Sequence, residues 1–127
     1  MSSVKIILDL ANSPHVILKR DEALELFECL YDETGGSRDL EESIRIVESF
    51  NEFLRVLKKK FEEYITPQKD QREVITGKAI VHKLKLFKEN DKEQVEIIFD
   101  RRFNIEYLKK CLNTMGYEDV IIEKQTL

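Results

Sequence analysis

The strongest constraint on the fold is the spacing of apolar residues between positions 39 and 65. Apolar side chains recur there every third or fourth residue, which is the period of a helix with one buried face. Asp39 followed by Glu42 resembles a helix capping box, and Thr66-Pro67 predicts the helix end because a residue before proline disfavours helical backbone. We therefore expect one long helix over 39–65, whose apolar stripe must pack on a sheet, a second helix or a partner. The stripe contains Val47, Phe50, Phe53, Leu54, Leu57, Phe61 and Tyr64.

Alternation of apolar and polar residues predicts strands before and after this helix. The first two strands form a hairpin near the N-terminus, and the next two form a longer antiparallel hairpin. Within the longer hairpin Gly77 is expected to mark a bulge, because the apolar parity shifts there. The predicted strands cover residues 4–10, 15–19, 73–87, 93–100 and 120–123.

Two shorter helices complete the pattern. One opens at Asp21 and ends near Tyr31, and the other is capped by Asn104 and closed by Gly116. The order of elements is then β-β-α-α-β-β-α-β. We expect an α+β fold in which a small mixed or antiparallel sheet is covered by one long amphipathic helix and two shorter helices. A chain of 127 residues buries enough surface for one core, so a single domain over 1–127 is expected.

The composition excludes several classes of protein. Hydrophobic residues make up 42% of the chain, too many for a disordered protein, and four Gly and two Pro are too few for a fibrous one. No apolar run exceeds three residues, so we expect no membrane-spanning segment, no signal-peptide core and a cytoplasmic location. Short chains of this composition are common among accessory and inhibitor proteins of mobile elements and viruses.

No residue pattern typical of catalysis or metal binding is present. Cys29 and Cys111 lie on predicted helices without a second Cys or His at ligand spacing, so we expect two reduced, half-buried thiols. We expect His82 to be a partly buried, hydrogen-bonded strand residue and His15, after Pro14, to be a solvated imidazole. The sequence therefore predicts no enzymatic activity, no metal and no cofactor.

Basic residues are concentrated in the second half of the chain. Residues 1–66 carry a net charge of −5, whereas residues 67–127 carry +1. Lys83, Lys85 and Phe87 are expected to project from one face of a strand. Some sheets bind single-stranded nucleic acid on a face of this kind, because cations contact phosphates while aromatic rings stack on bases.

Two further features bear on this basic strand. Glu96 and Asp100 on the adjacent strand could neutralise its lysines as cross-strand pairs. Arg101-Arg102 precede the helix cap at Asn104, where an anion could be held by guanidinium groups and helix amides. The candidate anion or nucleic-acid residues are Lys78, Lys83, Lys85, Phe87, Lys88, Arg101 and Arg102.

We favour a non-enzymatic protein-interaction or regulatory module, of the accessory or inhibitor type. The helix over 39–65 has more aromatic surface than one face of a small sheet needs, which predicts a homodimer or a protein partner. The alternative, in which this helix packs only on its own sheet, stays open. Single-stranded nucleic-acid binding is the less favoured second function. The candidate partner-interface residues are Val47, Phe50, Phe53, Leu54, Leu57 and Phe61.

Overall fold

The computed structural model describes residues 2–126, which form a five-stranded mixed sheet and five helices. The predicted α+β class and the predicted order of elements are confirmed. The strands are β1 (Ser3–Leu8), β2 (Pro14–Lys19), β3 (Val81–Glu89), β4 (Lys92–Phe99) and β5 (Asp119–Lys124). The helices are α1 (Arg20–Thr34), α2 (Arg38–Glu48), α3 (Phe50–Lys60), α4 (Gln71–Ile75) and α5 (Ile105–Thr114).

The strand order in the sheet is β3-β4-β2-β1-β5. β1 and β5 are parallel, and the other neighbouring pairs are antiparallel. It follows that β2 and β3 run in one direction and β4 and β5 in the other, and each of these two pairs is joined by a helical crossover. Such crossovers are right-handed in nearly all proteins. Because these two start from antiparallel strands and move in opposite directions along the sheet, right-handedness places both on the same face.

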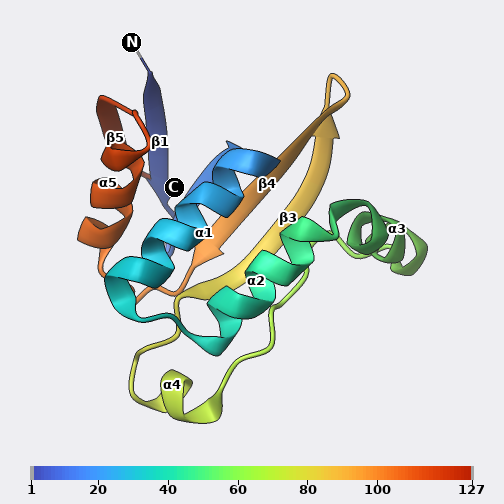
Figure 1. Ribbon diagram of the computed structural model, residues 1–127, viewed down its shortest axis with the longest axis horizontal. Coiled ribbons are helices and arrows are strands. Elements are labelled where there is room, and N and C mark those ends of the chain that lie inside the picture. Colours follow the sequence, from blue (N-terminus) through green and yellow to red (C-terminus); the bar gives the residue numbers. More distant parts are fainter. Residues whose placement is uncertain (1, 127) are drawn as a thin grey trace.

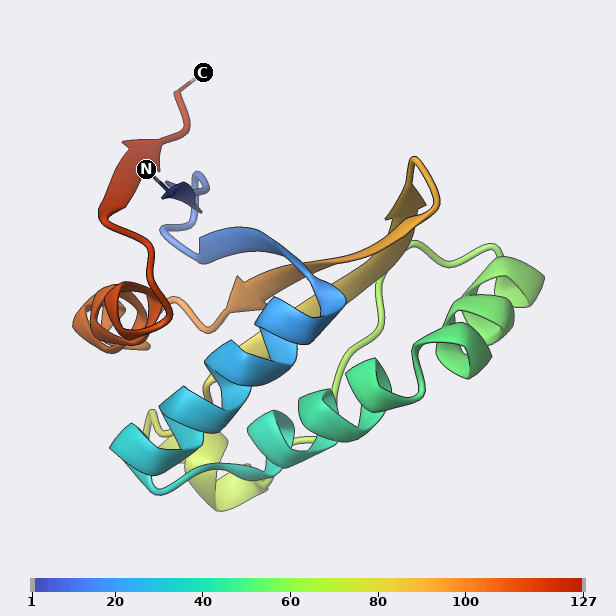
Figure 2. The ribbon, with the colours of Figure 1, turned by 45° about the horizontal axis from the view of Figure 1, so that its top comes forward.

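The helices accordingly gather on one side of the sheet. Figures 1 and 2 show α1 and α2 lying across this side and α5 beside the end formed by β1 and β5. The opposite side carries none of the described helices, and we call it the open face.

The core lies between the sheet and α1, α2 and α5. Alternate strand residues point into it, such as Ile6 on β1 and Val16 and Leu18 on β2, as the period-2 pattern predicts. Removing large apolar side chains from water supplies most of the folding free energy, about 1.5 to 3 kcal/mol for each. The helices contribute Leu26, Phe27, Leu30, Leu40, Val47, Phe50, Leu108 and Leu112.

The single helix expected over 39–65 is two helices, α2 and α3, which are separated at Ser49. The guanidinium of Arg20 donates hydrogen bonds to the carbonyls of Val47 and Glu48, at 3.0 and 2.6 Å. These carbonyls would otherwise accept the next hydrogen bonds of a continuous helix. The helix also ends at Lys60, with Phe61 in the left-handed conformation, and not at residue 65.

The predicted capping box at Asp39 is wrong, since Ser37 caps α2 by accepting a hydrogen bond from the Leu40 amide at 3.2 Å. Asp39 is fully buried and holds α2 against the start of β3. Its Oδ1 accepts hydrogen bonds from the amides of Ile80 and Val81, at 3.0 and 2.6 Å. A long-range contact of this kind cannot be read from local spacing.

The first arm of the long hairpin is shorter than predicted, because residues 71–75 form α4. The carboxylate of Asp70 caps this helix, and Gly77 follows it with a φ of 74°, so the predicted bulge at Gly77 is wrong. The register shift falls between Val81 and Lys83 instead. His82 occupies this bulge and is exposed, which also corrects the expectation of a partly buried, hydrogen-bonded histidine.

The expectation of two reduced thiols is wrong as well. Cys29 of α1 and Cys111 of α5 form a disulfide, with their Cα atoms 5.8 Å apart. The two helices pack side by side and bring the thiols within bonding range, although 82 residues separate them in the sequence. Neither their spacing nor their helical positions could indicate this pairing.

Candidate functional site

The open face combines apolar, aromatic and charged side chains on its five strands. Strand register places Ile7 beside His15 and sets Glu96 between Ile17 and Lys85. The other side chains on this face include Lys5, Lys83, Phe87, Ile121 and Glu123.

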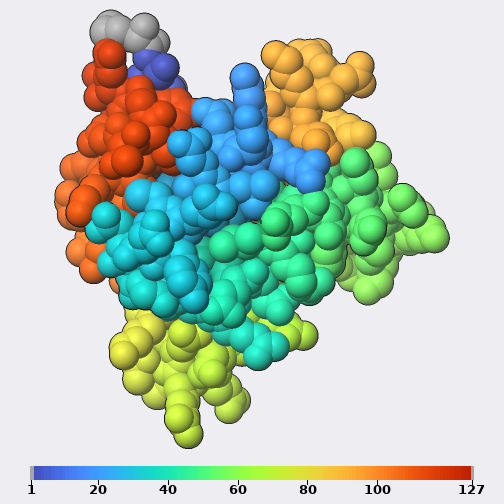
Figure 3. Space-filling model, in the orientation of Figure 1, coloured from blue at the N-terminus to red at the C-terminus, as the bar shows by residue number. Residues whose placement is uncertain are grey.

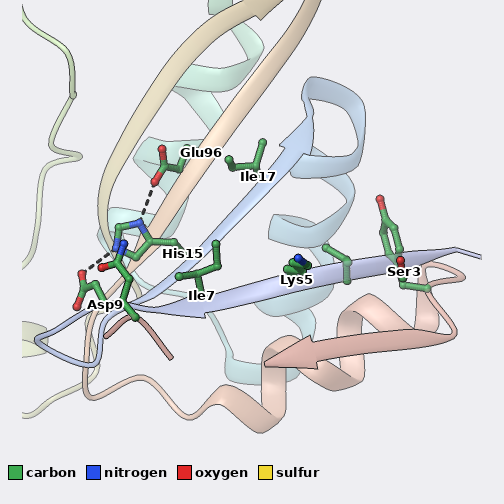
Figure 4. A pocket seen from close by; sticks show the side chains of 10 residues that line it. Ser3, Lys5, Ile7, Asp9, His15, Ile17 and Glu96 are labelled. Atoms are coloured by element: carbon green, nitrogen blue, oxygen red, sulfur yellow. Dashed lines mark hydrogen bonds and ion pairs between the residues drawn. The ribbon is translucent and has the colours of Figure 1, made fainter. Parts of the chain in front are cut away.

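An ion cluster occupies the centre of the open face. Nδ1 of His15 donates to Glu96 and Nε2 donates to Asp9, both at 2.8 Å (Figure 4). Burial disfavours the charged imidazole, but the hydrogen bonds and charges of Glu96 and Asp9 outweigh this effect and raise the pKa of His15. Both ring nitrogens lie at hydrogen-bond distance from a carboxylate, which favours the imidazolium form, so His15 is not the solvated side chain expected from the sequence.

Asp9 extends this cluster into the turn between β1 and β2. Its Oδ1 accepts from the amides of Ala11 and Ser13, each at 2.9 Å. Burial raises the pKa of Asp9, but the hydrogen bonds from His15 and the two amides have the larger effect in the opposite direction. The pKa of Asp9 is therefore below its usual value, and the carboxylate stays ionised. Both nitrogens of His15 are thus occupied by carboxylates, and the imidazole cannot accept a proton in this arrangement.

A hollow of about 410 Å³ lies beside the ion cluster. Lys5, Ile7 and Ile17 line it together with the cluster, and Ser3 lies at its far end (Figure 4). The hollow therefore combines the charged groups of the ion cluster with an apolar wall formed by Ile7 and Ile17.

A second cluster lies near β3, and we call it the cation–aromatic cluster: Tyr64, Lys83, Lys85 and Phe87. The Lys83 ammonium lies 5.9 Å from the centre of the Tyr64 ring. That of Lys85 lies 6.0 Å from the Tyr64 ring and 5.8 Å from the Phe87 ring. These distances are in the range of cation–π contacts. Tyr64 therefore adds a second aromatic ring to the group of Lys83, Lys85 and Phe87 that the sequence predicted on one face.

Tyr64 reaches this cluster because the chain after α3 runs along the edge of β3. Ile65 and Leu84 exchange two backbone hydrogen bonds, from Ile65 N to Leu84 O at 2.8 Å and from Leu84 N to Ile65 O at 2.9 Å. The sequence interpretation placed Tyr64 on the helix stripe and missed this role. The β-branched residues of Ile65-Thr66 before Pro67 were the only local signal for an extended segment here.

The expected ion pairs of Lys83 and Lys85 with Glu96 and Asp100 do not form. Glu96 is bound to His15 and Asp100 to Arg102, so neither forms an ion pair with Lys83 or Lys85. Lys85 instead pairs with Glu63 at 2.9 Å, and this hydrogen bond raises the pKa of Lys85. Within residues 2–126 Lys83 forms no ion pair.

The candidate interface residues of the predicted long helix mostly face the core. Val47, Phe50 and Leu57 are buried, and Phe53 and Leu54 are partly buried against the core. Phe61 differs from the others, because 97% of its side chain is exposed. The helix stripe is thus used mainly by the chain's own sheet.

The other predicted cations lie at the two ends of the β3–β4 hairpin. Lys78 precedes β3, and Arg101 and Arg102 follow β4, so the three meet at the opposite end of the hairpin from Lys88. Asp100 binds the Arg102 side chain at 3.2 Å, and Asn104 caps α5 as predicted. Of the predicted cations, Lys83 and Lys85 are the two that lie within cation–π distance of an aromatic ring in residues 2–126.

Two kinds of feature are absent from residues 2–126. None of the helices within residues 2–126 is long and apolar enough to cross a membrane. The same residues contain no group of three or more His, Cys, Asp or Glu side chains placed to hold a metal ion. Comparisons with protein-family models, with curated proteins and with solved structures give no match to this chain.

Proposed function

We propose that this chain is a non-enzymatic protein that binds single-stranded nucleic acid on its open face. The observation that carries the proposal is the cation–aromatic cluster, in which the rings of Tyr64 and Phe87 alternate with the ammonium groups of Lys83 and Lys85. Aromatic rings stack on unpaired bases, and ammonium groups contact the phosphates between them. This arrangement does not depend on base identity, so the expected ligand is single-stranded with little sequence preference.

The contrast with the helix stripe supports this choice. Val47, Phe50 and Leu57 are buried in the chain's own core, which leaves little of the stripe for the protein partner expected from the sequence. The total charge of −4 means that binding depends on a local patch and not on the charge of the whole molecule. We expect moderate affinity that falls steeply with added salt.

Fluorescence anisotropy with a labelled oligothymidylate of about 20 nucleotides, in about 50 mM salt, tests this function. Replacing one stacking ring, as in Tyr64→Ala or Phe87→Ala, should weaken binding about tenfold. The Lys83→Gln/Lys85→Gln variant should weaken binding and reduce its salt dependence, since it removes two phosphate contacts.

Lys109→Gln/Lys110→Gln is the matched control, because it removes the same charge from α5 and should leave affinity nearly unchanged. An equal loss in the control, or no binding by the unaltered protein at low salt, would contradict the proposal.

A second candidate function is self-association through the apolar side chains that β2 and β5 place on the open face. Ile17 is 51% exposed and Ile121 is 42% exposed, and both lie on strands that no described helix covers on this side. An apolar surface on a face of nearly balanced charge is compatible with a second copy of the chain. Light scattering after size-exclusion chromatography should then show a dimer that Ile17→Glu dissociates. A monomer at all concentrations would exclude it.

A further inference from the structure

Phe61 at the end of α3 is the most exposed large apolar residue of the described chain, with 97% of its side chain accessible. Its φ of 54° and ψ of 35° lie in the left-handed region, which favours Gly or Asn over an aromatic residue. The amide of Glu62 donates to the Leu57 carbonyl at 3.0 Å and closes the helix around it. Glycine would adopt this left-handed conformation with less strain, so the helix end does not require an aromatic side chain at position 61. The ring is exposed, so the core does not require it either.

The helix that carries Phe61 is cationic and projects from the body (Figures 1 and 3). Two of its residues, Phe50 and Leu57, are buried. Arg55, Lys58, Lys59 and Lys60 are all exposed, and none forms an ion pair within the described residues 2–126. Lys58, Lys59 and Lys60 lie in the last turn, where they compensate the negative end of the helix dipole. Arg55 lies before that turn, so the dipole does not explain it.

The tip of α3 and the cation–aromatic cluster are close along the chain. Phe61 is three residues from Tyr64, so their Cα atoms are at most about 11 Å apart. Small single-strand-binding domains contact about 4 to 16 nucleotides. A strand of that length is long enough to pass from the open face around the edge of β3, where Ile65 pairs with Leu84, to the tip of α3. Together they present six Lys or Arg residues against Glu52, Glu62 and Glu63, a net charge of +3 in a chain of −4.

We propose that α3 extends the nucleic-acid site, with Phe61 stacking on a base and Lys58, Lys59 and Lys60 contacting the phosphates next to it. The inference rests on the proposed function and enlarges its footprint beyond the sheet. An anionic membrane is the less suitable ligand. Beside Phe61, α3 exposes Val56 as its one other large apolar side chain, which is too little apolar surface for insertion.

The test compares a labelled oligothymidylate of about 5 nucleotides with one of about 20 nucleotides, using Phe61→Ala, Phe61→Gly and the unaltered protein. The longer ligand should bind about tenfold more weakly to both variants, whereas the shorter one, held by Tyr64 and Phe87, should bind unchanged. Phe61→Gly should also unfold no more easily than the unaltered protein, because glycine fits the left-handed backbone. Ile75→Ala removes another exposed apolar side chain, 79% accessible on α4, and should leave both affinities unchanged.

A charge variant gives the second measurement. Lys58→Gln/Lys59→Gln/Lys60→Gln should lower the salt slope of binding to the longer ligand by about two, and Lys109→Gln/Lys110→Gln/Lys124→Gln should not. If the α3 and Phe61 variants bind the longer ligand like the unaltered protein while Tyr64→Ala binds it weakly, this inference fails and the proposed function stands. If the unaltered protein binds neither ligand, both fail. Release of the Phe61 variants from phosphatidylserine vesicles, with oligonucleotide binding unchanged, would assign α3 to a membrane and overturn the inference.

Discussion

Single buried polar side chains fix the geometry of this protein at the residue scale. Asp39 joins the first turn of α2 to the amides that open β3, and Ser37 donates a third hydrogen bond to it at 3.0 Å. Its other oxygen, Oδ2, is buried and has no hydrogen-bond partner among the described residues. The carboxylate therefore serves mainly to satisfy two amides that would otherwise be buried without an acceptor.

Asp39→Ala should lower the free energy of unfolding by about 2 to 4 kcal/mol, because it leaves these two buried amides unsatisfied. Asp39→Asn keeps an acceptor oxygen and should lose less. Urea unfolding of both variants measures the difference. A loss below about 1 kcal/mol for Asp39→Ala would mean that water or a local shift satisfies the amides.

The ion cluster at His15 makes stability depend on pH. Since folding raises the pKa of His15, its contribution is complete below the unfolded value of about 6.5 and is lost as pH rises through the higher folded value. The stability difference between the unaltered protein and His15→Gln should therefore be largest near about pH 6 and shrink in alkaline solution.

His82→Gln provides a control of opposite sign. Partial desolvation of the exposed His82 ring and the nearby charges of Lys69 and Lys83 lower the pKa of His82, so its contribution is present above about pH 6.5 and is lost as the pH falls. Urea unfolding across this pH range distinguishes the two histidines. A difference for His15→Gln that does not vary with pH would contradict the ion cluster.

At the scale of elements, sequence periodicity predicts most of the structure. The alternation over residues 4–10 and 93–100 gives β1 and β4, and the caps at Asn104 and Gly116 frame α5, because these signals depend on neighbouring residues. The break at Ser49 could not be predicted, since Arg20 creates it from a distance. The extended run at Tyr64-Ile65 is likewise defined by its pairing with β3 and not by its own composition.

The disulfide is the main covalent link between elements, joining α1 to α5 across 82 residues. Closing a loop of this length should stabilise the fold by about 4 kcal/mol. A reducing agent should therefore lower the urea midpoint of the unaltered protein and leave Cys29→Ala/Cys111→Ala unaffected. Equal midpoints with and without the reducing agent would mean that the two thiols are not paired.

At the scale of the whole molecule, the handedness of the two crossovers determines which face of the sheet the helices leave uncovered. Both crossovers lie on one face of the sheet, so the side chains on the other face stay uncovered by helices. The sequence predicted Lys83, Lys85 and Phe87 together because they alternate on one strand. It could not predict Tyr64, or the Asp9–His15–Glu96 cluster, because these residues meet only after the sheet has formed.

An NMR titration of the isotope-labelled protein with a short oligothymidylate locates the binding surface residue by residue. If the cation–aromatic cluster binds single strands, the amide signals of residues 63–65 and 83–87 should shift together in proportion to ligand, whereas those of α1 and α5 should stay in place. Unchanged spectra at low salt, or shifts confined to α1 and α5, would contradict binding by the cation–aromatic cluster.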